Sequence, residues 1–421
     1  MRVWLTELTE PLPLSATAGG RLMRCGILAE TLARAGHDVV WWSSAFDHLT
    51  KAYRPAATGS GILRVTPQYR IWLLPGPPYR RNVSWARIRH HRAVARAFAE
   101  RAPQEPKPDV IVCSLPTLEV TEAAVRYGMS RGVPVVVDVR DLWPDAFLTL
   151  VPGWLRGVLR LPLVREFRRA RYVLGRAAAI IGTSAEYLAW GLRYAGRSRT
   201  PGDSVVPLGY PRLEIAAADR ARVREQLVAA GVDPAKTVCC FVGSFGRTYD
   251  LGPVLVGARR LKESGRPDVQ FVIAGDGERA AEWKAQAVGL TNVVFTGWLS
   301  ASEIAALLEL AHVGLAAYSD SAPQGLPNKV FEYMAAGLPI VSSLRGETQR
   351  LLAECNCGVT YDASTPESFV ATLKPLVDNP QQRTAMGRRA LERFRSVFDA
   401  TIIYRELSAH LEAIVAKRAE R

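Results

Sequence analysis

Short apolar runs alternate with longer amphipathic stretches along the whole chain. The runs VWLT, HDVVWWSS, RIWLLPG, DVIVCSLP, VPVVVDVRD and AAAIIGTS belong to the first half, and TVCCFVGS, VQFVIAG, VVFTG, HVGLAAY, LPIVSS and CGVTY belong to the second. This alternation predicts βαβ units, in which helices cover both faces of parallel sheets. The pattern therefore predicts an α/β protein.

A break in the pattern predicts two domains. Gly, Ser, Pro and Asp cluster at residues 195–204, and a chain of 421 residues with 48% hydrophobic side chains is too long for one core. We expect doubly wound domains over residues 1–198 and 205–396, with ligands held beyond the carboxyl ends of their strands. A helical stretch at about residues 400–421 can pack back on the first domain.

Charge is distributed unevenly along the chain. Lys and Arg total 54 against 40 Asp and Glu, and the first 200 residues hold 29 basic and 15 acidic residues, which is the whole excess of +14. This asymmetry indicates an anionic partner such as a lipid headgroup, a diphosphate or a nucleic acid; a solubilising arginine surface is the alternative.

Residues 147–173 combine apolar clusters around Trp154 with many arginines, and Pro162 divides them into two short amphipathic pieces. These pieces can lie on an anionic membrane, or they can be core helices with solvated arginines. Glu7 and Glu10 interrupt the apolar start that a signal peptide would need, so we expect a cytoplasmic protein, peripheral on the cytoplasmic face of the inner membrane.

Several familiar nucleotide-binding and metal-binding patterns are missing from the sequence. It contains no GxGxxG, no P-loop and no Asp-x-Asp pair, which argues against dehydrogenases, most NTPases and a divalent metal on a diphosphate. We therefore expect no metal and no cofactor, with fixed cations in their place.

Glycine turns follow several of the predicted strands. Gly19 and Gly20 precede a helical stretch, the turn Val242-Gly243-Ser244-Phe245-Gly246-Arg247 carries an arginine, and Phe295-Thr296-Gly297 ends another strand. Such turns let a phosphate or sugar approach backbone amides, although each alone is also an ordinary turn of an α/β protein.

The stretch Gly325-Leu326-Pro327-Asn328-Lys329-Val330-Phe331-Glu332 predicts a loop that opens a helix. Lys329 in the first turn can neutralise a diphosphate, and Glu332 can accept hydrogen bonds from both hydroxyls of a ribose. An anion and a diol together describe a nucleotide.

These motifs resemble the retaining glycosyltransferases of family 4, which have the GT-B fold of two Rossmann-like domains. The resemblance runs from the early Gly-Gly loop through VGSFGR, GDG and VFTGW to PNKVFEYMAAGLPIVSS. Residues 79–91 (YRRNVSWARIRHH) and 139–145 (VRDLWPD) are similar to the branch that includes L-fucosamine transferases of bacterial surface-polysaccharide assembly.

The resemblance implies that Glu332 binds the donor ribose, that Arg247 and Lys329 hold the diphosphate, and that residues 295–297 lie against the base. This chain has Gln324 where the family often has a further glutamate, and Ser244 and Tyr249 where many members have Arg and Lys. The donor-binding residues expected on this basis are Gly19, Gly20, Gly243, Ser244, Gly246, Arg247, Phe295, Thr296, Gly297, Gln324, Gly325, Leu326, Asn328, Lys329 and Glu332.

The first domain is expected to bind the acceptor. Asp141 is interpreted as a group that orients the acceptor or takes its proton, and Arg140 as a cation near a phosphate; a structural ion pair involving them is the alternative. His90 and His91 are interpreted as surface residues of an Arg-rich helix. The expected acceptor-binding residues are Arg81, Asn82, Arg87, His91, Arg140 and Asp141, and the expected catalytic residues are Arg140, Asp141, Arg247 and Lys329.

The function expected from these motifs is the transfer of a sugar from a nucleotide sugar, UDP-linked by preference, to a polyprenyl-diphosphate-linked or other glycan acceptor. Two alternatives remain. A nucleotide-sugar epimerase would turn over the donor without an acceptor, and a non-catalytic binder of membrane or nucleic acid would ignore nucleotide sugars. No recognition helix or aromatic RNA platform is visible, so we expect no nucleic-acid partner.

Overall fold

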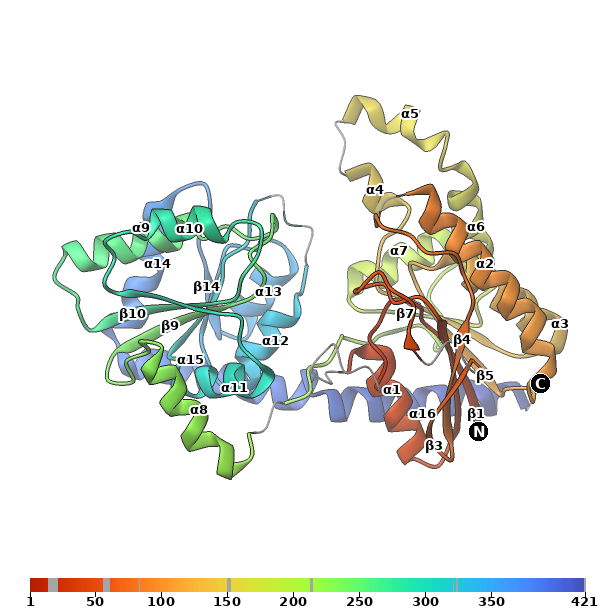
Figure 1. Ribbon diagram of the computed structural model, residues 1–421. Coiled ribbons are helices and arrows are strands. Elements are labelled where there is room, and N and C mark those ends of the chain that lie inside the picture. The colour runs from red at the N-terminus through yellow and green to blue at the C-terminus, as the bar shows by residue number, and fades with distance from the viewer. Residues whose placement is uncertain are drawn as a thin grey trace. The chain divides into compact units, whose positions relative to one another are not determined.

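The computed structural model describes residues 1–13, 22–55, 61–82, 84–149, 153–212, 215–320, 322 and 325–419. The chain forms two compact units (Figure 1): unit 1 consists of Met1–Leu208 and Ile403–Arg421, and unit 2 of Gly209–Ile402. Each unit is built on its own β-sheet covered by helices. The prediction of two α/β domains with parallel sheets is confirmed.

Unit 1 contains an eight-stranded sheet in the order β3-β4-β2-β1-β5-β6-β7-β8, in which only the β3–β4 pair is antiparallel. Its strands are β1 (Arg2–Thr6), β2 (Asp38–Ser44), β3 (Ile62–Thr66), β4 (Tyr69–Leu74), β5 (Val110–Ser114), β6 (Val135–Val139), β7 (Ala179–Gly182) and β8 (Ser204–Val205). The central strands are buried on both faces, which is why they read as continuous apolar runs.

The helices of unit 1 cover both faces of this sheet. They are α1 (Arg24–Arg34), α2 (Trp85–Arg101), η3 (Ala102–Gln104), α3 (Leu118–Arg131), α4 (Asp145–Thr149), η4 (Gly153–Leu155), α5 (Arg156–Arg160), α6 (Val164–Gly175) and α7 (Ala185–Ala195). Side chains of α2, α3, α6 and α7 pack with one face of the strands in a single core, which includes Trp4, Trp42 and Phe98. Trp4 and Trp42 meet edge to face with ring centroids 5.0 Å apart.

The last helix, α16 (Ala400–Ala419), begins in unit 2 and continues as part of unit 1. The hydroxyl of Tyr404 donates a hydrogen bond to the carbonyl of Leu208. His410 Nε2 lies 2.9 Å from the carbonyl oxygen of Gly202, and His37 Nε2 lies 2.9 Å from Glu412 Oε1. These contacts join the end of the chain to the first unit.

Unit 2 contains a parallel six-stranded sheet in the order β11-β10-β9-β12-β13-β14. Its strands are β9 (Thr237–Val242), β10 (Val269–Ala274), β11 (Val293–Gly297), β12 (Val313–Ala316), β13 (Ile340–Ser342) and β14 (Gly358–Thr360). Its helices are α8 (Ala217–Ala229), α9 (Gly252–Glu263), α10 (Ala280–Gln286), α11 (Ala301–Leu310), α12 (Asn328–Ala335), α13 (Glu347–Glu354), α14 (Pro366–Asp378), α15 (Pro380–Arg393) and the π-helical turn η5 (Phe394–Phe398).

Each apolar run quoted above forms a strand, whereas β3 and β8 were not predicted. The β3 sequence Ile-Leu-Arg-Val-Thr lies at the sheet edge and alternates between half-buried and exposed positions, and β8 has only two residues. Short edge strands carry too little apolar periodicity for a sequence pattern to reveal them.

Candidate functional site

The loops at the carboxyl ends of β9, β10 and β11 are hydrogen-bonded to one another. The amide of Gly243 donates to the carbonyl of Ala274 (2.9 Å), that of Phe245 donates to Asp276 (2.8 Å), and that of Gly275 donates to Gly297 (2.8 Å). These bonds fix the turns beside one another at the edge of the sheet. An edge of this kind in an open parallel sheet is where ligands bind.

Lys329 lies in the first turn of α12 and is nearly fully buried. Its Nζ donates to the carbonyl oxygen of Val242, the last residue of β9, and lies 3.8 Å from the ring centroid of Phe241 and 4.8 Å from that of Tyr249. A β-carbon at Gly243 would lie 2.7 Å from this nitrogen, so glycine leaves the space that the amine occupies.

Burial lowers the pKa of Lys329 to about 7, although the charge of Glu332 opposes the shift. The amine therefore titrates close to neutral pH and gains a proton when a second anion approaches. An ammonium group that is buried among two aromatic rings and one carbonyl is suited to a phosphate oxygen.

Glu332 lies one turn further along α12 and is also buried. Its Oε1 accepts a hydrogen bond of 2.6 Å from the hydroxyl of Tyr210, a buried residue at the start of unit 2. Tyr210 fixes one carboxylate oxygen of Glu332. Sequence reasoning missed Tyr210, because the two residues are separated by 122 positions.

Arg247 differs from Lys329 in its surroundings. Its side chain is 85% exposed and forms an ion pair of 3.0 Å with Glu278, itself largely exposed. An exposed pair of this kind is held weakly, so the guanidinium can exchange its carboxylate partner for a phosphate at little cost.

The other predicted donor residues of unit 2 lie along the same sheet edge or at the start of α12. Residues 295–297 end β11 and are half-buried, and Phe245 packs edge to face on Phe295 with centroids 6.3 Å apart. Ser244 is exposed, and Asn328 opens α12. Thr348 Oγ1 donates to the carbonyl of Gly325, which anchors the loop before that helix. Gly19, Gly20 and Gln324 lie outside the described residues.

In unit 1, Arg140 follows β6 and is held by carboxylates. Its Nη1 and Nη2 donate to Glu10 and Glu7, and its Nε lies 3.6 Å from Asp138. Burial pulls the pKa of Arg140 down, but Glu7, Glu10 and Asp138 outweigh it and raise the pKa. The structural ion pair that was the alternative interpretation of Arg140 is therefore present.

Asp141, the next residue, is half-buried. Burial raises its pKa, while the backbone amide of Trp143 and the charge of Arg87 lower it. A carboxyl with a raised pKa is a better proton acceptor than an ordinary surface carboxylate. Arg87 belongs to α2, so the structure brings two of the predicted acceptor residues within electrostatic reach of each other.

The interpretation of His90 and His91 as surface residues is wrong. His90 is 2% exposed and His91 8% exposed, and with Val94 and Phe98 they form the buried side of α2. His90 Nε2 lies 3.0 Å from Ser44 Oγ, and His91 Nδ1 lies 3.5 Å from Glu119 Oε2. In the sequence, the many arginines of α2 mask this row of buried residues. Its helical spacing was the only signal of burial. His91 is therefore a packing residue and does not present its ring to an acceptor.

Comparison with known proteins accounts for both units. Residues 19–209 match the family described as "Glycosyl transferase 4-like domain", and residues 236–379 match "Glycosyl transferases group 1". The chain carries two glycosyltransferase domains in a GT-B fold. Among curated relatives, D-rhamnosyltransferase WbpZ of Pseudomonas aeruginosa is 33% identical over 141 residues, which are 32% of this chain and 35% of that protein.

A D-inositol 3-phosphate glycosyltransferase of Arthrobacter sp. is 29% identical over 246 residues, which are 54% of each chain. The GT-B chain spans between 22% and 54% of the length of the curated relatives that it matches.

Solved structures with the same fold cover almost the whole GT-B chain. Sucrose-phosphate synthase from Thermosynechococcus elongatus has a TM-score of 0.72 at 16% identity and covers 99% of both chains. HepE of Anabaena in complex with UDP has a TM-score of 0.68 at 14% identity and covers 98% of this chain and 100% of its own. WaaG, a glycosyltransferase involved in lipopolysaccharide biosynthesis, has a TM-score of 0.63 at 16% identity, covering 96% and 98%.

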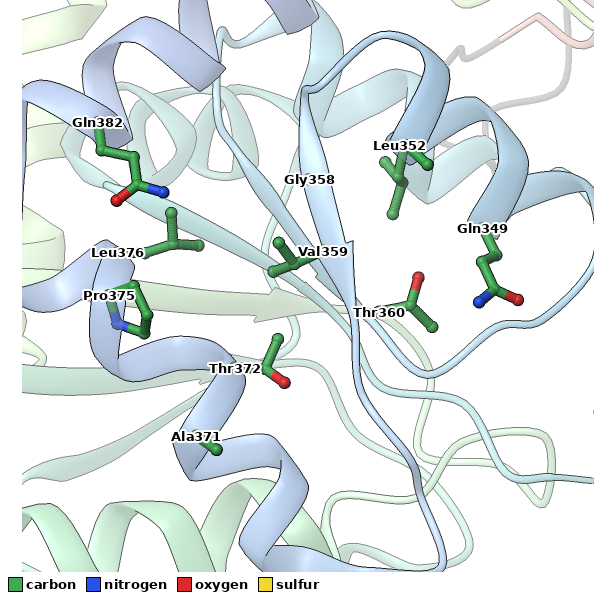
Figure 2. A pocket seen from close by; sticks show the side chains of 11 residues that line it. Gln349, Leu352, Gly358, Val359, Thr360, Ala371, Thr372, Pro375, Leu376 and Gln382 are labelled. Carbon is green, nitrogen blue, oxygen red and sulfur yellow. The ribbon is translucent and has the colours of Figure 1, made fainter.

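Unit 2 of the GT-B chain also contains a cavity away from the expected donor residues. It measures about 480 Å³ and lies beside β14, the edge strand, against α13, α14 and the start of α15 (Figure 2). Leu352, Val359, Thr372 and Leu376 are among its lining residues. None of the described donor residues predicted from the sequence lines it.

Two other kinds of feature are absent from the described part of the chain. No group of three or more His, Cys, Asp and Glu side chains is arranged to hold a metal ion there. No described helix combines the length and the apolar composition needed to cross a membrane.

Proposed function

We propose that the chain is a retaining, metal-independent glycosyltransferase. It transfers a sugar from a UDP-linked donor to a glycan acceptor, which is linked to a lipid diphosphate or to another carrier. The reaction belongs to the biosynthesis of a cell-surface polysaccharide. The two glycosyltransferase domains support transferase chemistry, and HepE, solved with UDP and with UDP-glucose, supports the nucleotide. The resemblance of residues 79–91 and 139–145 to the L-fucosamine transferase branch supports the polysaccharide setting, as does the fold shared with WaaG, a glycosyltransferase involved in lipopolysaccharide biosynthesis.

The position of Lys329 carries this proposal. Its amine reaches the end of β9 beside Gly243, and Glu332 follows one turn later. With Arg247 across the same turn, two cations and one carboxylate fit a nucleoside diphosphate: phosphates on the cations and a ribose diol on Glu332.

In the proposed reaction, the bond between the sugar C1 and the diphosphate oxygen breaks first, and both electrons leave with that oxygen. Lys329 and Arg247 stabilise the negative charge that develops on the diphosphate. The acceptor hydroxyl then forms a new bond to C1 on the face that the diphosphate left, and its proton passes to Asp141. Atoms and charges balance without an enzyme nucleophile or a metal ion.

A thermal-shift panel tests the nucleotide and the metal requirement together. UDP, GDP, ADP and dTDP are each added with and without EDTA, because a ligand of the folded state raises the melting temperature. We expect a shift with UDP that EDTA does not change. No shift with any nucleotide would overturn the donor assignment, and a shift that EDTA abolishes would overturn metal independence.

Retention is tested with a panel of UDP-sugars by following donor turnover in real time by proton NMR. An α-anomer as the first product from an α-linked donor is expected. A first product of β configuration would show inversion. Conversion of the donor sugar to its epimer without loss of UDP would favour the epimerase alternative.

We also propose that unit 1 contacts an anionic membrane through η4, α5 and the start of α6. Trp154, Val158 and Leu161 are 80%, 62% and 72% exposed, and Val164 is 43% exposed. The exposed arginines Arg160, Arg165 and Arg168 lie among them. Apolar side chains for the acyl boundary and cations for phosphate headgroups fit an anionic bilayer better than a neutral one.

Vesicle sedimentation tests this contact. The chain should bind phosphatidylglycerol vesicles and not phosphatidylcholine vesicles, and the double variant Trp154→Ala/Leu161→Ala should lose binding. Trp298→Ala is the matched control, since Trp298 is an exposed tryptophan of unit 2, 73% accessible. Equal binding by the double variant and the control would refute the membrane contact.

A further inference from the structure

Two cationic side chains of unit 1 donate hydrogen bonds to the same asparagine. Lys51, in the loop after β2, donates from Nζ to Asn82 Oδ1 (2.5 Å), and Arg87, in the first turn of α2, donates from Nη1 to the Asn82 carbonyl (3.0 Å). Lys51 lies in the loop after β2 and Asn82 in the loop after β4, and these loops follow the carboxyl ends of neighbouring strands. We call Lys51, Arg87, Asn82, Tyr79 and His48 the Lys51–Arg87 cluster.

Aromatic side chains form one side of this cluster. Lys51 Nζ lies 4.8 Å from the ring centroid of Tyr79, whose hydroxyl is 2.6 Å from His48 Nδ1. Burial lowers the pKa of His48 to about 4, with Arg87 and Lys51 adding to the shift, so this ring is neutral at pH 7. The tyrosine hydroxyl and the imidazole therefore supply hydrogen-bonding groups without adding a charge.

Neither cation is directly bonded to a carboxylate in the described part of the chain. Among the described residues, no carboxylate forms an ion pair with Lys51 or Arg87, and the Nε of Arg87 is buried without a hydrogen-bond partner. The nearby Asp47 is already paired with Arg54 at 3.1 Å. Burial lowers the pKa of Lys51 and the charge of Arg87 lowers it further, while the charge of Asp47 opposes the shift. Two neighbouring cations that lack a directly bonded carboxylate favour the binding of an anion between them.

A hydrogen-bonded turn fixes the loop that carries Lys51. Asp47 Oδ1 accepts from the amides of Leu49 (2.8 Å) and Thr50 (3.1 Å), which forms a tight turn. Lys51 itself has a φ of 58°, in the left-handed region that a long side chain seldom adopts. Residues with strained backbones cluster at binding sites, which supports a functional role for Lys51.

We propose that Lys51 and Arg87 bind a phosphate or diphosphate group of the acceptor. This inference rests on the proposed function, because it assigns the acceptor chemistry of unit 1. Two adjacent cations match the two or more negative charges of such a group, and Asn82, Tyr79 and His48 add neutral hydrogen-bonding groups for its remaining oxygens.

The location of the cluster agrees with this assignment. Arg87 acts on the pKa of Asp141, the proposed proton acceptor, as well as on those of Lys51 and Tyr79. The anion-binding groups and the proton acceptor therefore lie in one region of unit 1. A phosphate held there brings the attached acceptor close to Asp141.

Hydrogen–deuterium exchange on the full chain tests the proposal with sodium pyrophosphate as the probe, against sodium chloride at matched ionic strength. Peptides covering residues 46–54 and 84–91 should become protected in the wild type. Lys51→Ala and Arg87→Ala should abolish the protection and weaken pyrophosphate binding by about tenfold or more. Arg89→Ala, an exposed arginine on the same helix, should behave as the wild type.

Four results would overturn the proposal. One is unchanged exchange in these wild-type peptides, another is equal protection in Arg87→Ala variants that retain the wild-type melting temperature, and a third is equal protection by glucuronate, which would assign the site to carboxylates. Protection by phosphatidylglycerol vesicles but not by pyrophosphate would assign the cations to membrane headgroups and also refute the acceptor site.

The same experiment separates this proposal from the proposed function. UDP should protect peptides around residues 243–249 of unit 2, independently of pyrophosphate at unit 1. Protection by UDP with no response of unit 1 to pyrophosphate refutes only the acceptor subsite. Protection of unit 1 by pyrophosphate with no response to any nucleotide refutes the donor assignment and leaves an anion site.

Discussion

The hydroxyl of Tyr210 donates a 2.6 Å hydrogen bond to Oε1 of Glu332, and both side chains are buried. Tyr210 precedes α8 in unit 2, whereas Glu332 lies in the middle of α12. The bond holds one oxygen of the carboxylate in a fixed direction before any ligand binds. A carboxylate oriented in advance loses less entropy when it accepts hydrogen bonds from a ribose.

Replacing Glu332 should weaken nucleotide binding more than replacing its partner. We expect Glu332→Ala to reduce the affinity for UDP by about tenfold to a hundredfold, because hydrogen bonds to a charged group are lost. Tyr210→Phe keeps the carboxylate and should cost about tenfold or less. Isothermal titration calorimetry measures both affinities, with circular dichroism as the check on folding.

Glu332→Gln distinguishes charge from shape at this position, because the amide oxygen can still accept a hydrogen bond from Tyr210. Its UDP affinity should fall between those of Glu332→Ala and the wild type. Wild-type affinity in a folded Glu332→Ala variant would contradict the ribose assignment.

Lys329 should make donor binding depend on pH. Burial lowers its pKa from 10.5 to about 7, so the free folded protein loses this proton near neutrality while the unfolded chain keeps it. Between these values the unfolded state binds more protons, and this residue's contribution to the free energy of unfolding rises with pH. A bound diphosphate favours the ammonium form, so UDP affinity should fall as pH rises through 7.

Calorimetry at about pH 8, in two buffers of different ionisation enthalpy, should detect proton uptake on UDP binding. Lys329→Met is the control, because it keeps an apolar chain of similar length and has no amine to protonate. Identical proton uptake by this variant and the wild type would assign the titration to another group.

Arg247 should matter for turnover and not for stability. Its side chain is 85% exposed and pairs at the surface with Glu278. Arg247→Ala should reduce turnover of the donor on the order of 100-fold, as expected for one group that stabilises transition-state charge. Its urea midpoint should stay that of the wild type.

Glu278→Ala is the matched variant for Arg247, since it removes the surface ion pair and leaves the guanidinium in place. Its turnover should equal or exceed that of the wild type. If Glu278→Ala loses as much turnover as Arg247→Ala, the ion pair is required for the reaction and the guanidinium alone is not sufficient.

The sequence predicted those features that depend on neighbouring residues. Strands buried on both faces must be continuous apolar runs, and this identified β9 and β10 directly. The spacing of Lys329 and Glu332 places them one turn apart once a helix is assumed, so their shared end of α12 was predictable.

Partners that are distant in the sequence could not be predicted in this way. Glu7 and Glu10 are separated from Arg140 by 133 and 130 positions, and only the β1–β5–β6 order brings their loops together. The sequence does not distinguish an arginine that is free to bind a ligand from one whose charge is neutralised by carboxylates. The same holds for Lys51, whose role depends on a left-handed turn and on the side chain of Asn82.

Arg140 should therefore act mainly through stability. Its guanidinium is 12% exposed, and the carboxylates that it pairs with are 2% and 7% exposed. Removing one partner of a buried ion pair leaves uncompensated charges, so Arg140→Ala should lower the free energy of unfolding by about 3–5 kcal/mol. Urea denaturation measures this, with the exposed Arg81→Ala changing it by no more than about 0.5 kcal/mol. Lost turnover with wild-type stability would instead place Arg140 on a phosphate.

The turn after β10 should tolerate no side chain at Gly275. Its φ is 140°, and a β-carbon there would lie 1.9 Å from the carbonyl oxygen of Gly243, whose own amide bonds back to Ala274. The backbone conformation alone costs an alanine about 1–3 kcal/mol, and the clash would push the Gly243 turn away from Lys329. Gly275→Ala should thus lower the melting temperature by several degrees and weaken UDP binding together.

Gly246→Ala tests the same turn where space is free, because a β-carbon at Gly246 meets no atom within 4 Å. It should keep the melting temperature of the wild type, since added bulk has no consequence for the fold there, and a loss of UDP affinity in this variant alone would report the donor contact expected at Gly246. If both alanine variants bind UDP equally well, the close approach of the two turns does not shape the donor site. Weaker UDP binding in Gly275→Ala alone would assign the loss to the clash between the new β-carbon and the Gly243 carbonyl oxygen, which would lie 1.9 Å apart.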